Sequence, residues 1–301
     1  MQEYQRFYQG KTVVISGAAS GIGSALAHLF AEFGCKIAIC DIDGSALAQV
    51  VESIQATLQK NRSHADVSSP IVSQVVDVAS KEAWSAFLAK CIDTHEHIDL
   101  VINNAGIEGS SQPIWASSDD TLERVMDVNF YGMVFGSKTS LPYLVQRPWA
   151  ALVNVSSIFG LVAPPNTADY SASKFAIRGY TESLRAELEL VHPQVQVHLV
   201  HPGGINTNIT RLEHSQKFKQ RFLTTEPRAL ALQIAKGVMR NKARIVFGNQ
   251  AKRTAFASRL LPLSWLSKIL SKEIDGLGLE GDYIREHEGF KLPNKNDKTD
   301  S

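Results

Sequence analysis

The chain has 301 residues, 44% of them hydrophobic, which is enough to bury the core of one large domain or of one domain with an appendage. Its three cysteines are too few for a disulfide framework, and no apolar run reaches the roughly 18 residues of a membrane-spanning helix. The N-terminus lacks the apolar core of a signal peptide. From these features we expect a soluble, cytoplasmic protein with free thiols rather than a disulfide-stabilised secreted fold or an integral membrane protein.

The formal net charge of +1 hides an uneven distribution. Residues 1–209 hold 13 Lys and Arg against 20 Asp and Glu, a balance of −7, whereas residues 210–301 hold 18 against 10, a balance of +8. The chain therefore combines an acidic body with a basic C-terminal part. Nucleic acid is a poor partner for the basic part, because no recognition module is present and aromatic residues are not interleaved with the basic ones.

The first predicted elements surround a glycine-rich turn. Residues 11–16 have the β-branched character of a buried parallel strand, and an apolar helical pattern runs to Phe33. Between them stands Gly17-Ala-Ala-Ser-Gly-Ile-Gly23. Glycines at such a turn let the backbone approach a pyrophosphate, and the N-terminus of the helix offers it N–H groups. The segment predicts a dinucleotide-binding site.

A second predicted strand, residues 36–41, ends in Asp41. A carboxylate at this position can accept hydrogen bonds from the adenosine ribose hydroxyls, and it repels a 2′-phosphate. Neither Ile42 after it nor Ala19 and Ser20 in the turn is basic, so the sequence shows no partner for that phosphate. NAD is therefore the favoured cofactor, with NADP as the alternative.

Strands and helices continue to alternate along the next sixty residues. The patterns predict, in order, helix 44–60, strand 73–78, helix 81–95 and strand 98–103. Asp77, in the third strand, either meets the adenine or caps the next helix. Small residues in Asn104-Ala-Gly106, after the fourth strand, let the backbone lie against a cofactor. This alternation predicts an α/β fold with a doubly wound parallel sheet, a Rossmann-like three-layer α/β/α single domain over residues 1–250.

The candidate catalytic side chains come from two helices and the strand between them. One predicted helix begins near Ser118 and contains Asn129, whose spacing alone does not separate a functional side chain from a surface or kink residue. Strand 150–157 ends in two serines at the sheet edge where ligands bind. Tyr170 and Lys174 share the face of a later helix, and a nearby cation lowers the pKa of a phenol toward that of a general base.

The last part of the chain completes the sheet and then continues. Strand 195–200 leads to His201, which we interpret as a packed or hydrogen-bonded histidine, and helix 228–240 and strand 244–248 follow. Residues 251–290 form an amphipathic, basic C-terminal extension. Residues 291–301 are polar and lack periodicity, so we expect a disordered tail.

Within the extension, Pro262 breaks or kinks any helix. After it the chain places apolar side chains on one arc of a helical wheel and Ser and Lys side chains on the other; the apolar arc holds Leu263, Trp265, Leu266, Ile269 and Leu270. Two interpretations stay open. The arc packs on a neighbouring subunit or roofs the substrate pocket, or residues 252–272 contact a membrane surface peripherally.

Taken together, these motifs resemble those of the classical short-chain dehydrogenases/reductases over residues 11–209. The resemblance rests on Ser16-Gly-Ala-Ala-Ser-Gly-Ile-Gly23, Asn103-Asn-Ala-Gly106, Asn129, Val153-Asn-Val-Ser-Ser157, Tyr170-Ser-Ala-Ser-Lys174 and Pro202-Gly-Gly-Ile-Asn-Thr207, in the family's order. It implies a substrate lid near residues 210–225 and a homo-oligomer, a dimer or tetramer.

The resemblance also implies roles for single residues. Tyr170 would be the acid/base, Lys174 its partner and a ligand of the nicotinamide ribose, Ser157 the anchor of the substrate oxygen and Asn129 the holder of a relay water. Ser157 is preferred to Ser156, a structural hydroxyl, because it precedes Tyr170 by the family's usual thirteen residues. The cofactor site would comprise Gly17, Ser20, Gly21, Ile22, Gly23, Asp41, Asp77, Val78, Asn104, Ala105, Gly106, Tyr170, Lys174, Pro202, Gly203, Ile205 and Thr207; no metal is expected.

We therefore expect an oxidoreductase that transfers a hydride between a nicotinamide cofactor and a secondary alcohol or ketone. Apolar side chains near the site, Ile158, Phe159, Leu161 and Val162, indicate a hydrophobic substrate. One alternative is an NADPH-dependent carbonyl reductase of the same fold, despite Asp41. Another is a dinucleotide-sensing protein without catalysis. The presence of all four catalytic side-chain types argues against this alternative.

Overall fold

The structure, a computed structural model, describes residues 2–60, 70–207 and 222–275. Within these residues, seven strands form one parallel sheet in the order β3-β2-β1-β4-β5-β6-β7. The strands are β1 Thr12–Ser16, β2 Lys36–Asp41, β3 Val72–Val75, β4 Leu100–Asn103, β5 Ala150–Val155, β6 Val195–Pro202 and β7 Arg244–Phe247. The predicted doubly wound α/β fold is confirmed.

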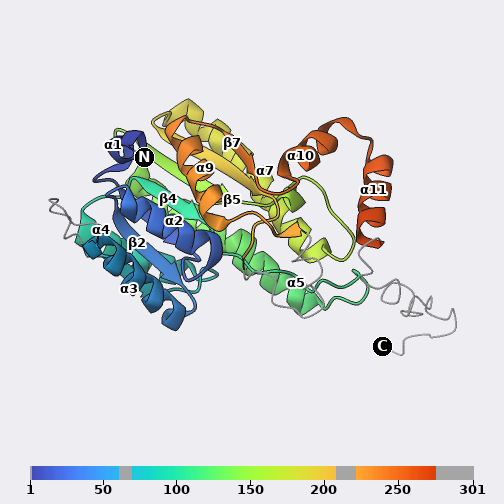
Figure 1. The fold of residues 1–301 in the computed structure, drawn as a ribbon, viewed down its shortest axis with the longest axis horizontal. Helices are drawn as coiled ribbons and strands as arrows, with labels where there is room; N and C mark the ends of the chain where they lie inside the picture. The colour runs from blue at the N-terminus through green and yellow to red at the C-terminus, as the bar shows by residue number, and fades with distance from the viewer. Residues whose placement is uncertain (1, 61–69, 208–221, 276–301) are drawn as a thin grey trace, which may run out of the picture.

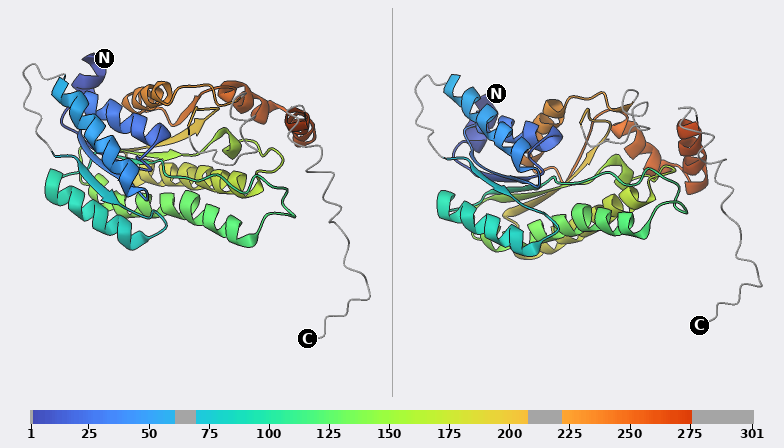
Figure 2. Two further views of the ribbon diagram at one scale, coloured as in Figure 1. Left: turned by 60° about the horizontal axis from the view of Figure 1, so that its bottom comes forward. Right: turned by 90° about the horizontal axis from the view of Figure 1, so that it is seen from below.

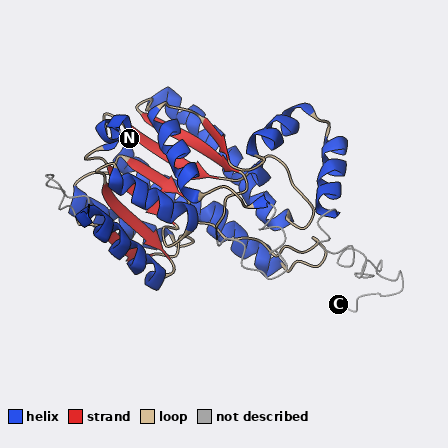
Figure 3. Ribbon diagram, in the orientation of Figure 1, coloured by secondary structure: helices blue, strands red, loops and turns tan. Residues whose placement is uncertain are grey.

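Helices cover both faces of the sheet, so that the strands lie in the middle layer (Figure 3). The helices are α1 Gln2–Tyr8, α2 Gly21–Glu32, α3 Gly44–Lys60, α4 Lys81–His95, α5 Asp119–Met126, α6 Gly132–Leu144, α7 Ala168–Val191, α9 Pro227–Met239, α10 Ala251–Leu260 and α11 Leu263–Asp275. Helices α2, α3 and α9 pack on one face, and α4, α6 and α7 pack on the other. Figure 2 shows the three layers from two further directions.

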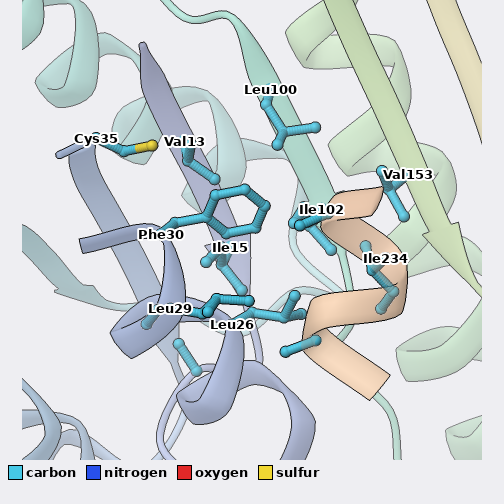
Figure 4. Close-up of a cluster of buried hydrophobic side chains, with 14 of the residues drawn as sticks. Val13, Ile15, Leu26, Leu29, Phe30, Cys35, Leu100, Ile102, Val153 and Ile234 are labelled. Carbon is cyan, nitrogen blue, oxygen red and sulfur yellow. The ribbon is translucent and has the colours of Figure 1, made fainter. Parts of the chain in front are cut away.

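The central strand β1 shows why these residues form a buried sheet. Val13 and Ile15 point into the core beneath α2 and α9, where they meet Phe30 and Ile234 (Figure 4). Val14 points to the opposite face and joins the core beneath α4. Because a strand that is buried on both faces must be apolar throughout, the run Val-Val-Ile is continuous rather than alternating. Each such side chain contributes about 1.5–3 kcal/mol through burial.

The strand order creates the crevice in which ligands bind in sheets of this kind. Strand β1 pairs with β2 on one side and with β4 on the other, so the chain changes direction across the sheet between β1 and β4. At such a switch point the helices that follow the two strands pack on opposite faces of the sheet, which leaves room at the carboxyl edge. The turn after Ser16 and the segment after Asn103 therefore border one crevice.

Two local predictions differ from the structure. Strand β3 ends at Val75, because the chain then turns: exposed Asp77 accepts a hydrogen bond from the Ala79 N–H, and Ser80 rather than Asp77 caps α4. Helix α1 has no counterpart among the predicted elements. It is anchored by buried Tyr8, whose hydroxyl donates to the Ala235 carbonyl at 2.7 Å.

The basic extension is described as far as Asp275, and it begins with two helices. Helices α10 and α11 project from the body of the molecule and are joined by a turn at Pro262 (Figure 1). In the described parts of the chain, no helix combines the length and hydropathy needed to cross a bilayer. Most of the predicted substrate lid and the whole predicted tail lie outside the described residues.

Candidate active site

The glycine-rich turn is held against the segment that follows β4. Gly17 has a φ of +66°, and a Cβ added to it would lie 2.7 Å from the Cα of Ala105. The Asn104 side chain donates to the carbonyls of Ser16 and Gly17, at 3.0 Å each. Only glycine fits this close approach in the left-handed region. Asn104, which was predicted to lie at the cofactor, thus also fixes the shape of the turn.

The N-terminus of α2 fits a phosphate. Its N-cap residue Ser20 is extended and makes no side-chain capping hydrogen bond, so no side chain of its own satisfies the first-turn N–H groups. Gly21 has a φ of +54°, and a Cβ there would lie 3.1 Å from the Thr207 methyl group. Thr207 therefore stands over the same turn, and these residues form a cradle that suits a pyrophosphate.

Asp41 ends β2 beside this turn. One carboxylate oxygen accepts from the Ala19 N–H at 2.9 Å, and the other accepts from the Asp43 N–H at 3.0 Å. These contacts hold the negative charge next to the glycine-rich turn. Ile42, the adjoining side chain, is exposed and apolar. The role predicted for Asp41 at the adenosine ribose stays a prediction.

A cavity of about 290 Å³ opens at the carboxyl edge of the sheet. The sequence-predicted site residues that line it are Ile22, Asn104, Gly106, Ser157, Tyr170, Lys174, Pro202, Gly203, Ile205 and Thr207. Its walls are largely apolar, with Phe159, Val162, Pro164 and Leu223 among them. Leu161, which was expected at this wall, is buried and does not line the cavity.

Tyr170 and Ser157 both line this cavity, and hydrogen bonding by the Ser157 side chain favours the phenolate form of Tyr170. Ser157 follows the end of β5, and its Oγ also accepts from the Phe159 N–H at 3.1 Å. Burial raises the pKa of Tyr170 to about 12; the bond to Ser157 acts against this shift, and the charge of Glu108 adds to it. The sequence-based expectation of a lowered pKa is wrong, because desolvation dominates.

Lys174 is almost completely buried, with 3% of its surface exposed. Its Nζ lies 5.4 Å from the centroid of the Tyr170 ring and donates to the Val155 carbonyl at 3.3 Å. Burial lowers the pKa of Lys174 to about 8. A Cβ on Gly106 would lie 3.3 Å from Nζ, so the glycine keeps space open beside the amine.

Asn129 lies in a π-helical segment, Asp127–Tyr131, between α5 and α6. Its Oδ1 accepts from the Ile107 N–H at 2.8 Å, and its Nδ2 donates to the Ile107 carbonyl and to the Ser173 hydroxyl. The side chain is fully buried and ties the loop after β4 to α7. Because these bonds occupy the amide, the predicted relay water stays a prediction.

Two neighbouring polar residues have structural roles, as the sequence suggested. Ser156 donates to the Lys174 carbonyl at 2.8 Å, which fixes α7 to the end of β5. His201 is buried, and its Nδ1 lies 2.7 Å from the Ser157 carbonyl oxygen. Burial lowers the pKa of His201 to about 4, so the ring is neutral and Nδ1 donates.

Several predicted cofactor residues lie outside the cavity. Asp77 is exposed and closes the turn before α4. Val78 is buried, and its side chain packs where a Cβ on Gly132 would otherwise stand. Gly17 and Gly23 belong to the turn and Ala105 to the segment packed against it, and none of the three lines the cavity. In the described residues, no group of three or more His, Cys, Asp or Glu side chains is placed to hold a metal ion.

The structure also adds site residues that sequence reasoning missed. Buried Asp169 accepts from the N–H groups of Ser110 and Tyr170, at 2.7 Å each. From α11, Leu270 and Glu273 line the cavity. The position of Asp169 in the first turn of a helix was visible in the sequence. Its contact with Ser110 was not, because the two residues are 59 positions apart. For the α11 residues the sequence offered only the general possibility that the extension roofs the pocket.

The fold and site define a dinucleotide-binding oxidoreductase, and comparison with known proteins gives its family. A family model described as short chain dehydrogenase matches residues 11–217. The oxidoreductase SadH of Mycobacterium tuberculosis is 35% identical over 268 residues, which cover 86% of this chain and 93% of SadH. The chain belongs to the short-chain dehydrogenase/reductase family.

Two further relatives carry a cofactor in their names. A 2-dehydro-3-deoxy-L-rhamnonate dehydrogenase (NAD(+)) from Sphingomonas is 33% identical over 181 residues, 60% of this chain and 67% of that enzyme. A crystal structure of a family member from Burkholderia phymatum, in complex with NAD, superposes with a TM-score of 0.75 at 25% identity. That match covers 84% of this chain and 93% of the other.

Proposed function

We propose that this protein transfers a hydride between a nicotinamide dinucleotide, NAD in preference to NADP, and a hydrophobic secondary alcohol or ketone. The observation that carries the proposal is that Tyr170 and Ser157 line one apolar cavity, with the Lys174 amine buried beside the Tyr170 ring. These side chains supply the proton and the orientation that a carbonyl group needs on reduction.

The residues at the carboxyl edge would hold the dinucleotide in a defined order. The turn from Gly17 to Gly23 would receive the pyrophosphate, Asp41 the adenosine ribose and Lys174 the nicotinamide ribose. When bound, the nicotinamide supplies the hydride or accepts it. Thr207 stands beside the turn and lines the cavity, where it would contact the carboxamide.

In the reducing direction, Tyr170 donates its hydroxyl proton to the substrate oxygen. Ser157 donates a hydrogen bond to the same oxygen and stabilises the charge that develops there. A Tyr170 pKa of about 12 keeps the phenol protonated at neutral pH, which suits the donating role. In the oxidising direction Tyr170 must accept the alcohol proton as a phenolate, and the Lys174 cation favours that form.

The preference for NAD rests on Asp41. Its carboxylate would meet a 2′-phosphate as a like charge, and the adjoining Ile42 offers no cation. The names of the Sphingomonas relative and the Burkholderia structure support NAD as well. The preference for a hydrophobic substrate rests on the cavity wall, where Phe159, Val162 and Leu270 of α11 line a space of limited volume.

A panel of ketones and secondary alcohols graded by chain length, run with NAD(H) and NADP(H), tests the proposal. The absorbance of the reduced nicotinamide reports turnover in both directions. We expect kcat/KM to rise with chain length and to be higher with NAD(H). Activity confined to small polar polyols would refute the substrate class. Dinucleotide binding without turnover of any compound would instead indicate a sensing protein.

A further inference from the structure

Helices α10 and α11 carry an exposed apolar patch, defined as Phe256, Leu260, Leu263, Trp265 and Ile269. The exposed fractions of these side chains range from 44% to 77%. Single exposed apolar residues are common on protein surfaces, but five large ones within fourteen residues indicate a surface that meets an apolar environment. The patch therefore requires a partner.

The patch is separate from the face by which α11 contacts the protein. Leu266, in the middle of α11, is 9% exposed, and Leu270, one turn further, lines the cavity. Leu263, Trp265 and Ile269 lie on either side of the face that carries Leu266 and Leu270, and they stay exposed. The apolar arc that the sequence predicted is thus divided: its centre faces the cavity, and its two margins are uncovered.

The most prominent part of the patch is the corner between the two helices. Leu260 and Leu263 lie on either side of exposed Pro262, and the arch formed by α10 and α11 stands away from the sheet and its covering helices (Figure 1). Phe256 is one helical turn before Leu260 and so lies on the same face of α10. An apolar corner of this kind can insert into the apolar part of another assembly without any rearrangement of the protein core.

Basic residues surround the patch, and acidic ones are missing from it. Residues 251–272 contain Lys252, Arg253, Arg259, Lys268 and Lys272 and no Asp or Glu. In α11, Lys268 follows Trp265 by three residues and Lys272 follows Ile269 by three, so each lysine is the helical neighbour of an exposed apolar side chain. The patch consequently combines apolar contact with a strong positive charge.

We propose that the α10–α11 patch is a peripheral membrane-binding surface that recognises the anionic headgroups of a lipid bilayer. Leu and Trp side chains enter the boundary between headgroups and acyl chains, while Lys and Arg remain at the headgroup level. Each basic residue near an anionic surface strengthens binding to it. A second copy of the chain is a poorer occupant, because pairing the patch with itself brings two basic clusters together with no carboxylate in residues 251–272 to offset them.

Co-sedimentation of the full-length protein with vesicles tests this surface without any reference to turnover. Vesicles of phosphatidylcholine alone are compared with vesicles that also contain phosphatidylglycerol, at low and at high salt. We expect binding to the anionic vesicles only, weakened by salt. Lys268→Gln combined with Lys272→Gln should reduce the affinity about 30-fold. Trp265→Ser combined with Ile269→Ser should abolish binding.

Matched controls separate the patch from general charge. Lys81→Gln combined with Lys138→Gln removes two exposed lysines from α4 and α6, and this variant should bind as the unaltered protein does. Circular dichroism melts show whether each variant is folded. Three outcomes would overturn the proposal: no binding to anionic vesicles, equal binding to neutral vesicles, or unaltered binding by the patch variants. Loss of a dimer or tetramer in the Trp265/Ile269 variant, with no vesicle binding by the unaltered protein, would assign the patch to a subunit interface.

Discussion

The Lys174 amine lies 5.4 Å from the centroid of the Tyr170 ring, one helical turn further along α7, and donates to the Val155 carbonyl. Burial acts on both groups in opposite directions: the pKa of Tyr170 rises to about 12, and the pKa of Lys174 falls to about 8. Burial therefore resists the formation of charge on either side chain. A bound cofactor and substrate must offset that resistance in catalysis.

The buried amine should make the stability of the protein depend on pH. Between about pH 8 and pH 10.5 the unfolded lysine holds its proton and the folded one does not, so stability rises with pH through this window. Below it, the buried cation costs about 3 kcal/mol. Lys174→Met should therefore be more stable than the unaltered protein at pH 7, lose activity, and show a stability advantage that shrinks above pH 8.

Urea unfolding at pH 7 and pH 9.5 measures this advantage, and the comparison between the two proteins cancels the contribution of Tyr170. Lys174→Arg serves as the control, because its cation does not titrate in the window. If the stability difference between Lys174→Met and the unaltered protein did not change with pH, the lowered pKa of Lys174 would be contradicted.

Cofactor preference should move with Asp41 and Ile42. Asp41→Ala combined with Ile42→Arg removes the carboxylate beside the Ala19 N–H and places a cation where a 2′-phosphate would lie. A hydrogen bond to a charged group is worth about 1.5–3 kcal/mol, so the ratio of kcat/KM for NADP(H) over NAD(H) should rise at least tenfold. Ile42→Arg alone should shift the ratio less. A preference for NADP(H) in the unaltered protein would show that Asp41 does not determine which of the two cofactors is bound.

Asp169 should act as a positioning residue for Tyr170. Its two oxygens accept from the N–H groups of Ser110 and Tyr170, which links the loop after β4 to the start of α7. Asp169→Asn keeps one acceptor oxygen and should lower kcat about tenfold, whereas Asp169→Ala keeps none and should lower it about 100-fold. KM for the dinucleotide should change little in both. A loss of thermal stability with unchanged kcat would identify a purely structural residue.

Helix α11 should tune the length of substrate that the cavity accepts. Leu270 lines the cavity, whereas Leu263 on the same helix is exposed and does not. Leu270→Ser should reduce kcat/KM about tenfold for the longest ketones and leave the shortest unaffected, because a lost apolar contact is worth about 1–3 kcal/mol. Leu263→Ser is the matched control. Equal effects on short and long substrates would show that Leu270 is not a substrate contact.

The structural features that depend on local sequence patterns could be predicted. Strand β1, the turn at Gly17 and the helix with Tyr170 follow from apolar runs, glycine spacing and helical periodicity. The doubly wound parallel sheet follows from the alternation of strands and helices, and the structure bears it out.

Other features depend on contacts between distant segments and were not predictable. The π-helical segment at Asn129 forms where its amide reaches Ile107. For Leu270, the sequence left open whether its helix roofs the substrate pocket, packs on a subunit or contacts a membrane, and the structure places it at the cavity. The direction of the Tyr170 pKa was predicted wrongly, because helical spacing reveals a nearby cation but not the degree of desolvation.

Replacement of Tyr170 by phenylalanine tests the central claim most directly, because it keeps the ring and removes only the hydroxyl. The measurement is kcat/KM for the best ketone of the panel, together with dinucleotide affinity and melting temperature. Tyr143→Phe, on α6, is the matched control. We predict a fall in kcat/KM of about 10³-fold, within the range for loss of a general acid, with affinity and melting temperature unchanged. Turnover by Tyr170→Phe equal to that of the unaltered protein would contradict the assignment of Tyr170 as the acid/base.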